Sequence, residues 1–235
     1  MAGRDETILA PPKSPSASER AYIAIERLLV TGHIAPRSIV NEMEICKSLG
    51  LGRTPVRLAL QRLADHGLLE IIPRRGMFVT EVDFQGQLLI LEARRELDRL
   101  LCETANTLAT ESDRSALKEM AREVQDAHVR RDFAALLETD LQFKLLLLSI
   151  ARNRFLTKAI VPIHALSRRF YFMHTAETDQ GVDVALVHLI RTVADGDRTA
   201  VGAASCKLTD ELERFAKETI LAKLGIEAGF ASGSH

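Results

Sequence analysis

Cysteine is scarce in this chain, with three residues among 235, and the formal net charge is only −1. Three cysteines without metal-type spacing cannot all pair internally, so the sequence favours neither a disulfide framework nor a cysteine-held metal. They are expected to be buried free thiols in a reducing cytoplasm. Because the chain is nearly neutral, any affinity for nucleic acid must come from local clusters of cations.

Long apolar runs are also missing, and the apolar stretch Leu145–Ile150 is too short to cross a membrane. The first residues include Arg4, Asp5 and Glu6, so no signal peptide is expected. The sequence contains neither a Gly-rich phosphate loop nor a Gly-x-Ser-x-Gly motif. These absences predict a cytoplasmic protein that has no membrane partner and is not an enzyme.

Apolar residues make up 46% of the chain, and its length suggests one small and one larger domain. The composition changes at two places. Residues 1–17 are rich in proline and serine and are expected to form a flexible tail, whereas long helical patterns begin after residue 82. We therefore expect a first domain at 18–82, a second at 83–224 and a C-terminal tail at 225–235.

One segment of the first domain has the pattern of a helix with a buried and an exposed face. Its apolar residues at helical spacing are Val56, Ala59, Leu60 and Leu63. Arg53, Arg57 and Gln61 form one adjacent row on the opposite side. Thr54 has a hydroxyl that could cap the first turn, and Pro55 suits the first helical position. Guanidinium groups in such a row can bind guanine edges or phosphates.

A basic hairpin is predicted directly after this helix. Leu69–Ile72 and Met77–Val79 are short β-prone runs. The turn Pro73–Gly76 joins them and carries Arg74 and Arg75 at its tip. This arrangement is typical of a wing.

Two more helices are predicted upstream. Apolar residues between positions 21 and 29 indicate the first, and Asn41 caps a second, which Gly50 ends. Three helices and a winged hairpin within about 65 residues form a winged helix-turn-helix, whose third helix is expected in the major groove of DNA. A basic amphipathic helix usually just faces solvent, but the order of helix, turn, helix and basic wing favours DNA binding here.

The run Asn41–Val79 resembles the DNA-binding domain of the GntR family of bacterial transcription regulators. The resemblance is densest in Leu49–Arg57 and in Pro73–Val79. Leu58 departs from the family pattern, since many members carry an acidic residue there, and Met43 stands where some carry an arginine that helps binding. Leu58 is predicted on the exposed side, where it could touch a thymine methyl group.

The resemblance implies that Arg53, Thr54 and Arg57 contact the operator and that Gly76 lies at the wing tip, which enters the minor groove. With the residues indicated by the helical pattern, the expected DNA-binding set is Arg53, Thr54, Arg57, Gln61, Arg74, Arg75 and Gly76. The resemblance also implies a homodimer that reads a palindromic operator. Release from DNA on effector binding is the commoner behaviour in the family, so a repressor is expected.

From Phe84 onward the pattern predicts six helices and no convincing strand. Their expected ranges are about 84–108, 111–130, 132–151, 154–175, 181–195 and 197–223, with turns at Asn153, Asp179–Gly181 and Asp195–Asp197. The expected fold is thus mainly α, with an N-terminal winged helix-turn-helix and a C-terminal antiparallel bundle. The number and order of these helices resemble the FCD domain, the effector-binding domain of the FadR-type branch of the same family.

Polar residues on inward faces are the best guide to a binding pocket in this bundle. Arg94 lies among apolar residues of the first helix, and a buried guanidinium needs an anionic partner. Asp140 and Lys144 lie on the inward face of the third helix, and Arg168 shares one side of the fourth with His164. An internal ion pair of Asp140 and Lys144, in one network with Arg94 and Asp98, and a ligand site explain these residues about equally well.

Many domains of this type hold a divalent metal with an aspartate, a histidine four residues later and two histidines on the last two helices. By that resemblance Asp140 matches the aspartate, whereas Lys144, Leu186 and Leu208 stand at the histidine positions. An ammonium repels a cation and leucine donates no electron pair, so neither a metal nor another cofactor is expected.

Two hypotheses for the pocket therefore stay open. In one, Lys144, helped by Arg94, supplies the positive charge that a metal provides in relatives, and a small carboxylate effector binds directly. In the other, Asp140 neutralises Lys144 and leaves an apolar pocket or none. The expected effector-binding residues are Arg94, Asp140, Lys144, Arg168, Leu186 and Leu208.

The sequence thus predicts a dimeric DNA-binding regulator that is controlled by a small molecule in its C-terminal bundle. The alternative is a winged-helix module that docks onto proteins and carries a ligand-free bundle. Basic residues on both the helix and the wing favour DNA, and a steep fall of affinity with salt would support it.

Overall fold

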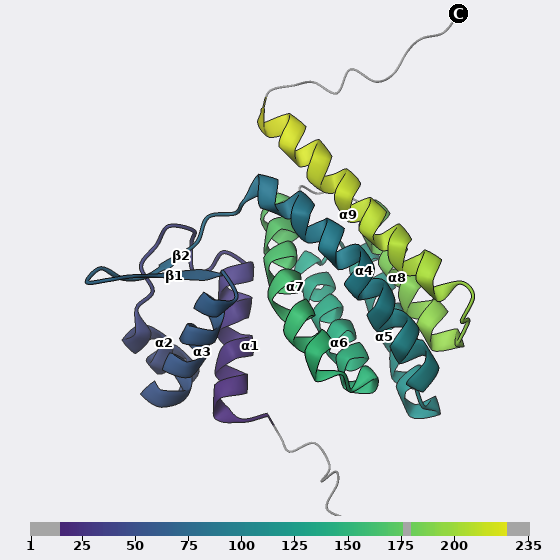
Figure 1. The fold of residues 1–235 in the computed structure, drawn as a ribbon, viewed down its shortest axis with the longest axis horizontal. Coiled ribbons are helices and arrows are strands. Elements are labelled where there is room, and N and C mark those ends of the chain that lie inside the picture. The colour runs from purple at the N-terminus through teal and green to yellow at the C-terminus, as the bar shows by residue number, and fades with distance from the viewer. Residues whose placement is uncertain (1–14, 176–179, 225–235) are drawn as a thin grey trace, which may run out of the picture. The chain divides into compact units, whose positions relative to one another are not determined.

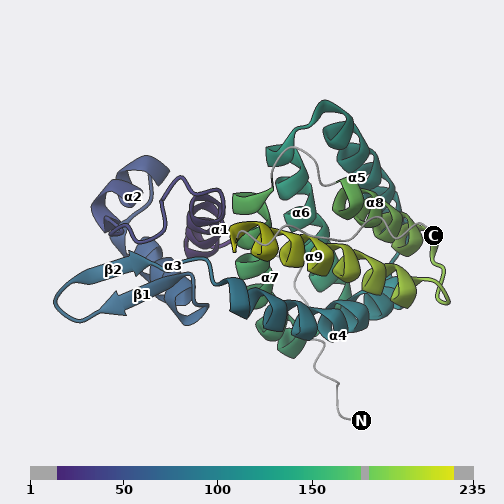
Figure 2. The same cartoon turned by 90° about the horizontal axis from the view of Figure 1, so that it is seen from above.

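The computed structural model describes residues 15–175 and 180–224 and divides the chain into two compact units, Met1–Thr80 and Glu81–His235 (Figures 1 and 2). The expected C-terminal tail and most of the expected N-terminal tail lie outside the described residues. The N-terminal tail was predicted to reach residue 17. Instead, the first helix begins at Ala17, because the Ser16 hydroxyl accepts a hydrogen bond from the Glu19 amide.

The first unit contains three helices and a two-stranded hairpin, as the pattern predicts. Its elements are α1 (Ala17–Val30), α2 (Glu42–Leu49), α3 (Arg53–Asp65), β1 (Leu69–Ile72) and β2 (Gly76–Val79). The strands are antiparallel, with Leu69 opposite Val79 and Ile72 opposite Gly76. Helix α3 packs against α1, α2 and β1. The fully buried side chains at these contacts include Ile25, Leu29, Leu60, Leu63 and Leu68.

Both ends of α2 follow from the sequence. The Asn41 side-chain oxygen accepts hydrogen bonds from the amides of Met43 and Glu44, at 3.1 and 3.3 Å. Gly50 ends the helix at φ +61°, in the left-handed region that glycine adopts without a steric penalty. The tight connection to α3 depends on this conformation.

The start of α3 differs from the prediction. The helix begins at Arg53 with Gly52 as its N-cap, and no side chain caps it. Thr54 is therefore the second helical residue and not the cap, and Pro55 is the third. Pro55 fits there because the first amides of a helix have no intrahelical acceptor, so its missing N–H costs no hydrogen bond. The Thr54 side chain is left exposed.

The second unit consists of six helices in the described residues, in the expected order. They are α4 (Phe84–Leu108), α5 (Glu111–Arg130), α6 (Phe133–Ala151), α7 (Arg154–His174), α8 (Gln180–Asp195) and α9 (Val201–Lys223). Helix α4 runs beside α9, as both views show, and also packs on α6 and α7 (Figures 1 and 2). Helix α5 packs on α6 and α8. One continuous apolar core joins them.

Two helix starts in this unit were predicted wrongly. Helix α9 begins at Val201 and not near residue 197, because the Asp197 carboxylate accepts hydrogen bonds from the amides of Thr199 and Ala200 and closes a turn first. Gln180 and Gly181, both expected in a turn, already belong to α8. The first residue of that expected turn, Asp179, lies outside the described residues.

The cysteines are free, but they are not all buried as expected. Cys102 is fully buried, whereas Cys46 and Cys206 are partly exposed. Burial raises the pKa of the Cys102 thiol to about 11, so this side chain stays protonated at neutral pH. Within the described ranges, no helix combines the length and the apolar character needed to cross a membrane.

Replacing Gly50 tests whether its left-handed backbone holds α2 and α3 in place. A side chain at this position would meet no atom within 4 Å, so the cost of Gly50→Ala is conformational rather than steric. We expect Gly50→Ala to lower the free energy of unfolding of the first unit by about 1–2 kcal/mol. Gly50→Asn should cost less, because asparagine adopts this conformation more readily. Urea unfolding measures both, and equal stability of wild type and Gly50→Ala would contradict the account.

Candidate functional site

One face of α3 is covered by exposed polar side chains. Arg53, Thr54, Arg57 and Gln61 all lie on the solvent side, opposite the four buried apolar residues of the helix. The Arg57 side chain is 79% exposed, and its Nε lies 3.8 Å from a carboxylate oxygen of Glu42 on α2. A pair this long and exposed contributes little to stability, so the guanidinium can turn towards another anion at small cost.

Leu58, beside this row, is also exposed, as predicted. The Leu58 side chain is 59% exposed, so an apolar group lies at the surface beside these arginines. Met43 on α2 is similarly exposed. The two departures from the family pattern thus both lie on the surface.

The wing presents a second group of cations. Arg74, Arg75 and Gly76 are all exposed at the end of the hairpin. Arg74 adopts φ +64° and Gly76 adopts φ +104°. Glycine adopts such positive φ values far more readily than other residues. The Arg75 guanidinium lies 5.7 Å from the centre of the Phe78 ring. Gly76 pairs with Ile72 and therefore begins β2 rather than belonging to the turn.

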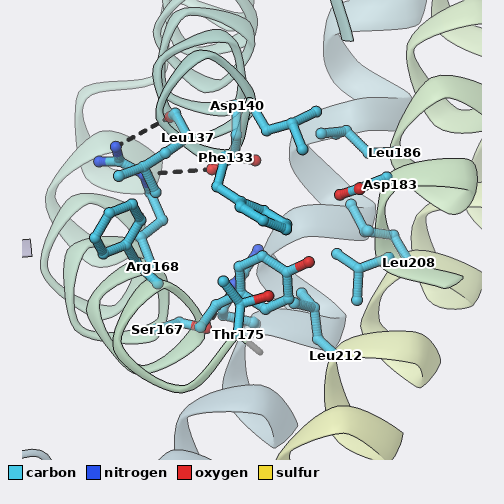
Figure 3. A pocket seen from close by; sticks show the side chains of 15 residues that line it. Phe133, Leu137, Asp140, Ser167, Arg168, Thr175, Asp183, Leu186, Leu208 and Leu212 are labelled. Atoms are coloured by element: carbon cyan, nitrogen blue, oxygen red, sulfur yellow. Dashed lines mark hydrogen bonds and ion pairs between the residues drawn. The ribbon is translucent and has the colours of Figure 1, made fainter. Parts of the chain in front are cut away.

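Five helices of the second unit, α4, α6, α7, α8 and α9, enclose a cavity of about 50 Å³ (Figure 3). Its walls are mostly apolar and include Phe133, Leu137, Leu186, Leu208 and Leu212. Polar groups reach it from Arg94, Asp140, Ser167, Arg168 and Asp183. Five of the six residues expected in an effector site, all except Lys144, line this one cavity.

The polar groups on the α6–α7 side of the cavity are held in place by each other. The Arg168 Nη2 donates to the Leu137 carbonyl oxygen at 3.1 Å, and its Nε lies 3.4 Å from Asp140 Oδ2 (Figure 3). The Asp183 carboxylate on α8 accepts a hydrogen bond from His128 Nδ1 at 3.0 Å, which ties α8 to α5. Asp140 and Asp183 therefore each have a partner.

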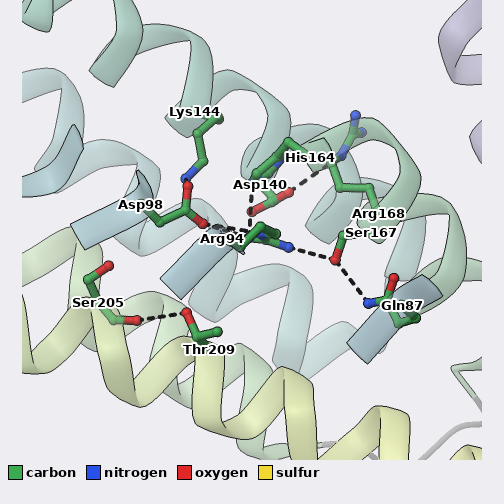
Figure 4. A network of polar contacts seen from close by, with 10 residues as sticks. All are labelled: Gln87, Arg94, Asp98, Asp140, Lys144, His164, Ser167, Arg168, Ser205 and Thr209. Atoms are coloured by element: carbon green, nitrogen blue, oxygen red, sulfur yellow. Dashed lines mark hydrogen bonds and ion pairs between the residues drawn. The ribbon is translucent and has the colours of Figure 1, made fainter. Parts of the chain in front are cut away.

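A second buried network surrounds Asp98 on α4 (Figure 4). Arg94 donates from Nε to Asp98 Oδ2 at 3.1 Å, and Lys144 donates from Nζ to Asp98 Oδ1 at 2.8 Å. Of the two open hypotheses, the one in which Asp140 neutralises Lys144 is therefore wrong, because Lys144 binds Asp98; Lys144 also does not line the cavity. The internal ion-pair network that the sequence left open does exist.

Arg94 links the network to the cavity. Besides Asp98, it donates from Nη1 to the Ser167 hydroxyl at 2.7 Å, and its Nη2 lies 3.1 Å from His164 Nε2. Ser167 also accepts from Gln87 Nε2 at 3.1 Å. The cationic head of Arg94 is thus fixed on several sides by residues of α4 and α7.

The electrostatics of this network are set by burial and by nearby cations. Burial opposes ionisation of Asp98, but Lys144 and Arg94 outweigh it and hold the pKa of the carboxyl below its usual range. Burial, together with the charges of Arg94, Lys144 and Arg168, holds the pKa of His164 well below 6.5. His164 is therefore neutral at pH 7, and its Nε2 can accept the hydrogen bond from Arg94.

Several residues of the network were missed or only half recognised from the sequence. His164 was expected on the pocket side of its helix, but nothing indicated that it holds Arg94. Ser167 and Gln87 were not singled out, because a serine and a glutamine on a helix usually face solvent. Apolar spacing alone could have placed both inward, since each lies beside buried neighbours at helical spacing.

The divalent metal of related domains does not fit this cavity. Asp140, Leu186 and Leu208 do converge on the cavity, as the resemblance implies. The only oxygen ligand among these positions, Asp140, faces Arg168, and two leucine side chains offer no electron pair. In the part of the chain that the structure describes, no group of three or more His, Cys, Asp and Glu side chains is placed to hold a metal.

Comparison with known proteins adds independent information. Residues 17–79 match the family model described as bacterial regulatory proteins, gntR family, and residues 89–210 match the FCD domain. A transcriptional regulator from an unstable DNA locus of Streptomyces ambofaciens is 39% identical over 62 residues, or 26% of each chain. The HTH-type transcriptional regulator YdhC of Bacillus subtilis is 25% identical over 146 residues, which cover 62% of this chain and 65% of YdhC. The chain thus spans less than two thirds of either relative.

The solved structures agree in fold. Escherichia coli McbR/YncC superposes with a TM-score of 0.66 over 89% of this chain and 98% of McbR/YncC, at 18% sequence identity. Identity this low supports a shared fold and nothing more.

Neutral, buried His164 predicts a pH dependence of stability. Its pKa is lowered in the folded state, so as pH falls through about 6.5 the unfolded chain gains a proton that the folded chain does not. The free energy of unfolding of the second unit should therefore decrease below pH 6.5. His164→Gln, which can still accept from Arg94, should reduce this slope by up to about 1.4 kcal/mol per pH unit.

Urea unfolding at pH 7.0 and 5.5 measures the effect. The matched control is His188→Gln, because His188 is exposed on α8 and should leave the slope unchanged. A His164→Gln variant with the slope of wild type would show that His164 does not stay neutral in the folded protein.

Proposed function

Because the chain belongs to the GntR family of bacterial regulatory proteins and carries an FCD domain, we propose that it is a DNA-binding transcriptional regulator controlled by a small molecule. The observation that carries the proposal is the joint exposure of arginines on α3 and on the wing of one small unit. The chain is nearly neutral overall, so these residues form the local cationic surface that DNA binding requires.

The exposed residues have different roles in this proposal. Arg53, Arg57 and Gln61 lie along α3, so they read base edges in the major groove, and Thr54 contacts the backbone at the start of the helix. Arg74 and Arg75 contact the phosphates of the DNA backbone. Gly76 has no side chain and therefore lets the wing approach the minor groove closely. The long, exposed Glu42–Arg57 pair does not prevent Arg57 from turning towards the DNA.

The regulator acts as a homodimer on a palindromic operator. One winged unit offers few base contacts and therefore modest affinity. A dimer whose spacing matches two half-sites gains both sets of contacts, because the second binding event is intramolecular. The protein acts in the cytoplasm, where its DNA is, and since a transcriptional regulator is not normally an enzyme we assign it no catalytic activity.

The effector binds in the cavity lined by Arg94, Asp140, Arg168, Leu186 and Leu208. Effector binding is coupled to DNA binding because the affinity for the effector differs between the DNA-bound and the free dimer. We propose that the effector favours the free form, which makes the protein a repressor. Helix α4 carries Arg94 and is the first helix after the wing, so it connects the effector site to the DNA-binding unit along the chain.

Selection from random duplexes with the intact protein, followed by footprinting, tests DNA recognition. A two-fold symmetric site should be recovered. Arg53→Ala and Arg57→Ala should each weaken binding to that site by about 1–3 kcal/mol, because each removes base contacts. Arg122→Ala on α5 is the control, since this exposed arginine of the second unit should not affect binding.

Replacing the wing arginines should give a different signature. Arg74→Ala and Arg75→Ala should weaken binding to specific and non-specific duplexes alike. Each should reduce the slope of log affinity against log salt by about 2, because the homodimer loses one phosphate contact in each half-site. If the intact protein protects no duplex, or if the arginine variants bind like wild type, the surface is not a DNA-binding surface. A protein-docking role for the winged unit would then be the better account.

A further inference from the structure

We infer that Leu58 determines part of the sequence specificity of this protein, by contacting the C5 methyl group of one thymine in each half-site of the operator. The inference rests on the proposed function, because it takes α3 as the helix that lies in the major groove. It deepens that function by naming a base of the operator and the side chain that recognises it. Leucine forms no side-chain hydrogen bond, so its role differs from that of the arginines beside it.

The first observation is the exposure of Leu58. Its side chain is 59% exposed, whereas Val56, Leu60 and Leu63 of the same helix are buried. Leu58 alone is apolar among the exposed residues of α3, which the structure describes from end to end: Arg53, Thr54, Arg57, Leu58, Gln61 and Asp65. A single exposed leucine is common on protein surfaces, so its position on the helix decides what it can contact.

Leu58 lies near the centre of the exposed side of α3. At about 100° per residue, it points about 150° away from the mean direction of the four buried residues of the helix. Gln61 points about equally far away, whereas Arg57 points only about 110° away. Because the buried side packs on the rest of the unit, the opposite side faces the floor of the groove. Leu58 therefore faces the base edges more directly than Arg57, which lies nearer the flank of the helix.

The surroundings of Leu58 suit duplex DNA better than an apolar protein surface. Its neighbours at helical spacing include Thr54, Gln61 and Arg62, and Arg57 directly precedes it. None of these four residues is acidic, so none of them repels the phosphates. An apolar partner would desolvate their polar groups without offering hydrogen bonds, which is costly. Leu58 is thus one apolar group within a polar and cationic surface.

Thymine offers the complementary arrangement. In the major groove its C5 methyl group is an apolar group that lies among hydrogen-bonding base edges. Adenine, guanine and cytosine would present donors or acceptors to Leu58, and these would lose water without gaining a partner. Burial of one methyl group favours binding about fourfold in each half-site. Leu58 therefore selects thymine at the position that it faces.

Removing the methyl group from the DNA tests the inference with the full-length protein. The duplex is the operator that wild type recovers by selection. Each thymine of a half-site and its symmetric counterpart are replaced in turn by deoxyuridine, which lacks the C5 methyl group and keeps the base pair. We expect the replacement at one symmetric pair of positions to weaken wild-type binding about 15-fold, because two methyl contacts of about fourfold each are lost.

Three variants assign the effect. Leu58→Ala keeps a good helix former at an exposed position, and it should bind the thymine and deoxyuridine duplexes within about twofold of each other. Met43→Ala is the matched control, since Met43 is 56% exposed on the neighbouring helix α2, and it should keep the difference of about 15-fold. Selection with Leu58→Glu should replace thymine at this position with cytosine, whose amino group can donate to a carboxylate.

The inference is wrong if no thymine shows the methyl effect with wild type, or if the effect persists in Leu58→Ala. Recovery of the same base by Leu58→Glu would also contradict it. In each of these cases wild type still binds its operator, so the proposed function stands. Protection of no duplex by wild type would instead contradict the proposed function, and the inference with it. The two failures are therefore distinguishable.

Discussion

The second unit of this protein is organised around one buried carboxylate that is shared by two cations. Asp98 holds Arg94 on one oxygen and Lys144 on the other, and thereby joins α4 to α6 inside an apolar core. A buried ion pair of this kind is weak evidence for stability, since desolvation offsets much of the attraction. Its consequence is a fixed orientation of Arg94 and a fixed local charge, and the character of the neighbouring cavity follows from both.

The two units use arginine in opposite ways. On α3 and the wing, guanidinium groups are exposed and weakly paired, so they are free to meet a polyanion. In the bundle, Arg94 and Arg168 are buried and held by several partners, so each guanidinium keeps one orientation at the wall of the cavity. The chain connects these two functions through α4, which follows the wing and carries Arg94. A ligand can control DNA binding only if its affinity differs between the two states of the dimer.

Much of the architecture could be predicted from the sequence, because helix caps and apolar spacing are local signals. Asn41 and Gly50 mark the ends of α2, and the inward positions of Arg94 and Asp140 follow from helical phase. The sequence also suggested that Arg94 and Asp98 belong to one ion-pair network with Asp140 and Lys144. It did not show that Lys144 binds Asp98 directly, since the two residues lie 46 positions apart on different helices and spacing within one helix says nothing of its neighbour. The prediction that Thr54 caps α3 was wrong for a different reason. The N-cap is Gly52, two residues before the position that the Thr54 hydroxyl suggests.

The central claim is that the exposed arginines of α3 and of the wing act together on duplex DNA. The most direct measurement is footprinting of the operator recovered from random duplexes, with wild type and with a variant that carries both Arg57→Ala and Arg74→Ala. The account predicts a two-fold symmetric footprint for wild type that disappears in the double variant at the same protein concentration. Protection of no duplex by wild type, or equal footprints for the two proteins, would contradict it.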